Sequence, residues 1–164
     1  METTTFDTSI LNNIHNIMRW VVLLFGLLTL ISGLSGLGGK KDFTHGDKRT
    51  ALYFLISVDL QLLIGLALYF FKGYYRNFSS GNMGAIMKDS VARFWTIEHA
   101  VGMLIAIILV HVGYSGTKGQ KPHVAKFRRL FWCTLIALLL IVASAPWPFR
   151  TLGIARPWFP GMGV

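Results

Sequence analysis

Cysteine and acidic residues are scarce in this sequence of 164 residues, which contains one cysteine, Cys133, and seven Asp and Glu. A single cysteine excludes an intrachain disulfide and any zinc or iron–sulfur site that needs several thiolates. The sequence also shows no glycine-rich phosphate loop, no Ser-His-Asp arrangement and no His-Glu-x-x-His zinc motif. Several common enzyme classes are therefore not indicated, and the apolar segments carry the main signal.

Charged residues make up 14% of the chain, whereas about 25% is usual for soluble domains, and 53% of the residues are hydrophobic. This composition predicts an integral membrane protein surrounded by membrane lipid. The 16 Lys and Arg lie mainly in short segments between apolar runs, where they indicate topology and contact with anionic lipid. Nucleic acid is therefore not expected as a partner.

Four apolar runs divide the chain into candidate membrane spans. They predict helices over about 10–37, 50–71, 93–113 and 130–145, followed by an interfacial tail, 146–164, that contains Pro and Trp. The fold class expected is an all-α membrane protein, a four-transmembrane-helix bundle formed by one domain over 1–164, with both termini on the same side. The first and third loops carry nine Lys and Arg against seven on the opposite side, so the positive-inside rule predicts cytoplasmic loops and periplasmic N and C termini.

The third apolar run contains ionisable residues that lipid contact does not explain. Glu98 and His99 lie near its start, and His111 lies near its end. An ionisable side chain at membrane depth costs roughly 3 kcal/mol or more, so each of these residues is a functional candidate that should face a partner. Asp59 in the second run is a further candidate, for a proton or cation path or for an interhelical bond.

The first and third spans run in the same direction, so His15 and Arg19 should lie at the same membrane face as Arg93, Glu98 and His99. His15 and Arg19 are four residues apart and therefore share one face of their helix. We expect Arg19 and Glu98 to form an ion pair, which would make both charges tolerable. Titratable groups thus converge on one end of the bundle.

His111 should lie near the other end of the bundle, close to the loops that contain His45 and His123. It follows His99 by 12 residues, which corresponds to about 18 Å along the helix and a rotation of roughly 120°. One cofactor cannot use both histidines, but two cofactors stacked across the bilayer could use one each. Cores of helix bundles are recurrent haem sites, with an inward-facing His from each of two helices.

Three segments resemble a family of small bacterial membrane proteins commonly labelled cytochrome b. They are His15-x-x-x-Arg19-Trp20 in the first span, Asp59-Leu-Gln-Leu-Leu-Ile-Gly65 in the second, and Arg93-Phe-Trp-Thr-Ile-Glu98-His99 in the third. The similarity covers nearly all four spans. It implies a b-type haem in a four-helix bundle of the bacterial inner membrane, a role in membrane electron transfer, and His15 and His99 as ligands of the haem iron.

The leading hypothesis is therefore a membrane cytochrome b that acts as a subunit of a respiratory or quinol-linked complex. Arg19 and Arg93 would neutralise the haem propionates, Glu98 would orient His99 or relay protons, and His111 could hold a second haem. Quinone is an expected ligand, and a homo-oligomer or partner membrane subunits are expected.

Other interpretations remain open for the same residues. The chain could be a non-catalytic accessory or assembly subunit in which Arg19, Asp59, Glu98 and His99 form interhelical polar locks. It could also be a small ion-handling protein with Asp59 and Glu98 along a path. In either case the histidines would be structural or interfacial, and those of the loops would be solvated.

Overall fold

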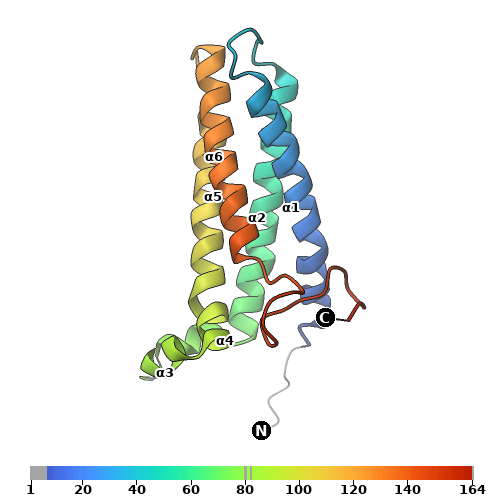
Figure 1. Ribbon diagram of the computed structural model, residues 1–164, viewed down its shortest axis with the longest axis vertical. Coiled ribbons are helices and arrows are strands. Elements are labelled where there is room, and N and C mark those ends of the chain that lie inside the picture. The colour runs from blue at the N-terminus through green and yellow to red at the C-terminus, as the bar shows by residue number, and fades with distance from the viewer. Residues whose placement is uncertain (1–6, 80, 82, 164) are drawn as a thin grey trace.

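The computed structural model describes residues 7–79, 81 and 83–163, and the parts of the predicted domain and tail on residues 1–6, 80, 82 and 164 lie outside the described residues. Four long helices form an antiparallel bundle, which confirms the expected all-α fold (Figure 1). The elements in chain order are α1 (Ser9–Ser35), α2 (His45–Phe71), η1 (Tyr74–Phe78), α3 (Met83–Lys88), α4 (Ser90–Arg93), η2 (Phe94–Glu98), α5 (His99–Ser115) and α6 (His123–Ser144).

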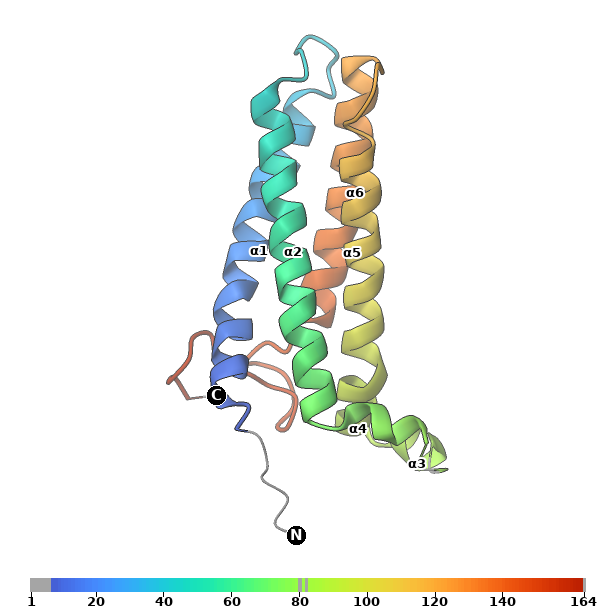
Figure 2. The same cartoon turned by 180° about the vertical axis from the view of Figure 1, so that it is seen from behind.

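The four long helices surround a shared interior. Both α1 and α5 pack against α2 and against α6, so α1 and α5 lie diagonally opposite each other (Figures 1 and 2). We call the end where α1 begins and α6 ends the base, and the end with the α1–α2 and α5–α6 connections the loop end. The short helices α3 and α4 lie at the base.

The segments Ser9–Ser35, His45–Phe71, Ser90–Ser115 and His123–Ser144 are long and apolar enough to cross a membrane. The third of these joins α4, η2 and α5 into one continuous span. Two spans begin earlier than the sequence predicted, α2 at His45 instead of about 50 and α6 at His123 instead of about 130. Pro122 precedes α6, and the basic residues behind it are good helix formers, so the helix extends beyond its apolar part.

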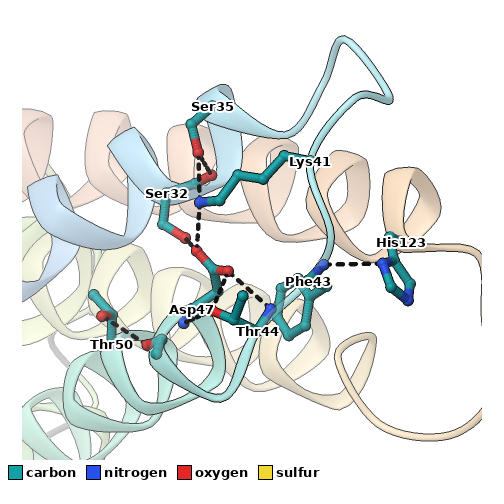
Figure 3. Close-up of polar contacts among 9 residues, drawn as sticks. Ser32, Ser35, Lys41, Phe43, Thr44, Asp47, Thr50 and His123 are labelled. Atoms are coloured by element: carbon teal, nitrogen blue, oxygen red, sulfur yellow. Dashed lines mark hydrogen bonds and ion pairs between the residues drawn. The ribbon is translucent and has the colours of Figure 1, made fainter.

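Asp47 organises the loop end and explains the early start of α2 (Figure 3). Its carboxylate accepts from the Ser32 hydroxyl at 2.7 Å, from Lys41 Nζ at 2.9 Å, and from the backbone N–H of Thr44 at 3.0 Å. The Thr44 hydroxyl in turn accepts from the Asp47 N–H, which completes a capping box at the start of α2. Lys41 and Asp47 thus form an ion pair that joins the loop to the start of α2.

The core and the outer surface of the bundle are both apolar. The buried cluster consists of Val22, Phe54, Val58, Ala106, Val110, Ala137 and Ile141. Many large side chains are exposed along the spans, including Leu27, Leu63, Ile108 and Leu139. Because lipid solvates such side chains, the outward display of Leu and Ile is the arrangement expected of a membrane bundle.

The segment after α6 folds back against the base. Its bend is closed by a hydrogen bond from the Arg156 N–H to the Pro146 carbonyl. The rings of Trp147 and Trp158 lie 6.3 and 5.9 Å from that of Trp20, measured between centroids. The predicted irregular tail is therefore irregular in backbone but packed on α1.

Candidate functional site

The structure brings His15 and His99 together at the base. His15 lies in the second turn of α1 and His99 is the first residue of α5, so the two side chains approach from diagonal helices. Their ring centroids are 6.3 Å apart and the ring planes cross at 72°. The parallel direction of the first and third spans places both residues at one depth, as the sequence suggested.

A π-helical turn, η2, positions His99. Here the backbone N–H of His99 bonds to the carbonyl of Phe94, five residues earlier. The turn is held from outside: the Tyr69 hydroxyl donates to the Thr96 carbonyl at 2.9 Å, and the Asn77 side chain donates to the Thr96 hydroxyl at 2.7 Å. Single π-helical turns within α-helices are frequent at functional sites.

The hydrogen bond of His99 determines which of its nitrogens can bind a ligand. Nδ1 lies 2.9 Å from the carbonyl of Ser144, and a carbonyl only accepts, so Nδ1 carries the proton. In a neutral ring Nε2 is then free to coordinate a metal, and a backbone carbonyl on the other nitrogen is the usual outer partner of a metal-binding His. Gly102 permits this contact, because a Cβ there would lie 2.2 Å from Ser144 Oγ.

Three buried polar atoms around His15 have no hydrogen-bond partner: His15 Nδ1, Arg19 Nε and Gln61 Oε1. The Gln61 amide donates to the His15 carbonyl at 3.0 Å, which ties α2 to α1 at this level. Gly65 faces the His15 ring, and a Cβ there would lie 3.1 Å from its Cε1. Buried polar atoms are nearly always paired, so these three atoms have hydrogen-bonding capacity that the described protein groups leave unused.

Four cations surround this region without forming ion pairs among the described residues: Arg19, Lys72, Arg150 and Arg156. Arg19 is only 7% exposed and donates to Asn16 Oδ1 at 2.7 Å and to the carbonyls of Pro157 and Trp158 at 3.0 Å.

The other three cations also bond to neutral groups. Lys72 donates to Asn12 Oδ1 at 2.9 Å, Arg150 to the Ala143 carbonyl, and Arg156 to the Ala155 carbonyl at 2.7 Å. Burial, and then the nearby charge of Arg156, lower the pKa of Lys72. These four cations thus give the region around His15 and His99 positive charge that no carboxylate of the described residues pairs with.

Arg93 and Glu98 are placed differently from the expectation. They form an exposed ion pair with Arg93 Nε 2.6 Å from Glu98 Oε1. The predicted ion pair between Arg19 and Glu98 is wrong. The π-helical turn brings residues five positions apart onto one face, so Glu98 meets Arg93 on the outside while Arg19 is buried.

His111 lies against Asp59, with His111 Nε2 2.9 Å from Asp59 Oδ1. The expected approach of His111 to loop histidines is not what the structure shows. His123 Nδ1 instead lies 3.1 Å from the backbone nitrogen of Phe43 and 2.8 Å from Asp42 Oδ1, and His45 is the first residue of α2. Asp59 and Glu98, which the ion-handling interpretation placed along one ion path, thus pair with different residues, His111 and Arg93.

Several contributing residues were not identified from the sequence as site residues. Ser144 acts through its backbone carbonyl, which leaves no signal in residue type. No local pattern distinguishes Tyr69, Arg150 and Arg156 from the aromatic and basic residues that are usual at membrane interfaces. The available signal for a close approach between helices was a glycine one turn from a polar residue, as Gly65 is from Gln61.

The fold and the four spans define an integral membrane protein of the four-helix type. No protein-family model, curated protein or solved structure matches the chain. Within the described ranges, no three His, Cys, Asp or Glu side chains lie close enough to hold a metal ion together.

Proposed function

We propose that the protein is a b-type haem protein of the membrane that transfers electrons, in which His15 and His99 would hold one haem iron. The observation that carries this proposal is the close approach of two imidazoles from diagonal helices, with centroids 6.3 Å apart. A metal–imidazole bond is about 2 Å long, so two imidazoles at this separation could both reach one metal ion.

The number of available ligands favours a haem over a bare metal ion. Two histidines leave the remaining coordination positions of any ion to groups outside the protein, because no third protein ligand lies within reach in the described residues. A porphyrin supplies four nitrogens and needs only axial ligands from the chain. His99 is already oriented for this role by the Ser144 carbonyl.

The charges at the base support an anionic group such as a haem with two propionates. Arg19, Lys72, Arg150 and Arg156 have no carboxylate partner among the described residues, and arginine suits carboxylates through paired hydrogen bonds. We therefore assign the propionate contacts to cations of this group. Arg93, expected in the same role, already neutralises Glu98.

The haem would supply one-electron chemistry, while the chain binds it, fixes His99 and neutralises its charge. Quinol in the bilayer is the proposed electron donor, within a respiratory or quinol-linked complex of the bacterial inner membrane. The basic loops at the loop end favour a cytoplasmic position for that end and a periplasmic position for the base.

A second candidate function is an accessory subunit without a cofactor. The contacts of Arg19 with the segment after α6 favour it, because they show a buried charge that serves as a polar lock between distant segments. In that case the imidazoles of His15 and His99 contact only protein groups.

Absorption spectroscopy of the purified chain separates the two functions. We expect a Soret band in wild-type protein from cells supplied with haem precursor, and its loss in His15→Ala and in His99→Ala. His45→Ala, at the exposed start of α2, is the matched control and should keep the band. A colourless wild-type protein that also fails to bind added haemin would refute the haem proposal and leave the accessory role.

A further inference from the structure

The ion pair of Asp59 and His111 lies on the outside of the bundle, at membrane depth. Asp59 is near the middle of α2, and its partner is one turn from the end of α5. Their side chains are 43% and 51% exposed. The other ion pairs of the described residues, Lys41–Asp47, Arg93–Glu98 and His123–Asp42, lie at the ends of the bundle or in its loops.

The surroundings of this pair are apolar. On α2 it is flanked by exposed Ile56 and Leu63, one turn before and after Asp59, and on α5 by exposed Ile108, one turn before His111. Hydrocarbon offers no hydrogen bonds, so a half-exposed carboxylate and imidazole at this depth call for a polar group that covers them.

The pair has hydrogen-bonding capacity left over. Within the chain the bond uses His111 Nε2 and Asp59 Oδ1. The second ring nitrogen of His111 and the second carboxylate oxygen of Asp59 form no hydrogen bond among the described residues, because each of these side chains bonds only to the other. The exposed surface thus offers one nitrogen and one oxygen side by side.

We propose that the outer face of α2 and α5 around Asp59 and His111 is a two-fold interface with a second copy of this chain. The surface is self-complementary when both ring nitrogens of His111 carry protons, as an ion pair with Asp59 requires, because the free ring N–H of one copy can then donate to the free carboxylate oxygen of the other. A two-fold axis along the membrane normal keeps every residue at its depth, so the pair of one copy meets the pair of the other. Four side chains then satisfy one another across the interface, and the flanking Ile and Leu pack around them.

Disulfide cross-linking in lipid vesicles tests the interface in a Cys133→Ser background, which removes the native thiol. Ile108→Cys, 60% exposed beside His111, should cross-link into a dimer at a high lipid-to-protein ratio. Leu27→Cys on α1, 53% exposed and a similar distance from the loop end, is the matched control and should stay monomeric. Equal cross-linking at both positions, or none at Ile108→Cys, would overturn the proposal.

The polar pair itself is tested by subunit counting in the same vesicles. Asp59→Asn and His111→Asn should each weaken dimerisation about tenfold, because each removes two symmetric interhelical bonds that contribute several-fold apiece. The fold of each variant is checked by the unchanged helix content of the purified protein. Wild-type protein that remains monomeric at all lipid dilutions would refute the interface, and this result is independent of whether a Soret band is present.

Discussion

Substituting Arg19 by methionine should release the segment that follows α6 from the base. Arg19 donates to the carbonyls of Pro157 and Trp158, both at 3.0 Å, and a hydrogen bond from a charged donor contributes about 1.5–3 kcal/mol. Each carbonyl keeps one other donor, Asn16 at 3.1 Å or Trp20 Nε1 at 2.9 Å. Methionine also avoids the desolvation of a buried guanidinium. We therefore expect a net loss near 2 kcal/mol for docking of the segment, or roughly 30-fold in its open population.

Amide hydrogen exchange measures this opening, because the Arg156 N–H is bonded to the Pro146 carbonyl while the segment is docked and exchanges when the segment detaches. Exchange follows the open population when opening and closing are fast, so the Arg156 amide should exchange about 30 times faster in Arg19→Met than in wild type. Arg76→Met, which changes an arginine whose side chain contacts Tyr75 instead, is the control and should leave the rate unchanged. Equal rates for Arg19→Met and wild type would refute the view that this arginine holds the segment.

Four further substitutions test other contacts. Asp47→Ala should lower the free energy of unfolding by about 3 kcal/mol, because it removes the carboxylate that accepts from several donors. Thr44→Ala should lower it by only about 1 kcal/mol, because it removes one N-cap. Denaturation in mixed detergent compares the two variants. Tyr69→Phe should cost about 1–2 kcal/mol by the same measurement, through the lost bond to the π-helical turn, and an unchanged midpoint would contradict that role. Gly102→Val should destabilise the α5–α6 contact by more than about 2 kcal/mol, because even its Cβ would overlap Ser144, and an unchanged thermal midpoint would contradict this close approach.

The helices and one half of the candidate site could be predicted from the sequence. Each span is a long apolar run, and run length determines bilayer crossing almost independently of tertiary contacts. The shared depth of His15 and His99 followed from the equal direction of the first and third spans, whereas their pairing as ligands was implied by the family resemblance. Neither the spans nor the shared depth requires the rotation of any helix about its axis.

The contacts that depend on rotation or on backbone atoms could not be predicted. The Arg93–Glu98 pair depends on a π-helical turn, which shifts the register by one residue and has no signature in residue type. The Asp59–His111 pair depends on how α2 and α5 are rotated toward each other. The roles of Arg150 and Arg156 depend on the fold-back of a segment whose backbone is irregular.

The placement of His111 on the outer face nevertheless follows from helix geometry once His99 faces the interior. Twelve residues of α-helix correspond to a rotation of roughly 120°, and α5 is helical over that whole interval. If His99 points across the bundle toward His15, His111 must point about a third of a turn away, which is where it meets Asp59. The same helix therefore cannot direct both histidines to the shared interior. Under the haem proposal, this geometry favours one internal haem per chain over two, and it leaves His111 to contacts on the outer face of the bundle.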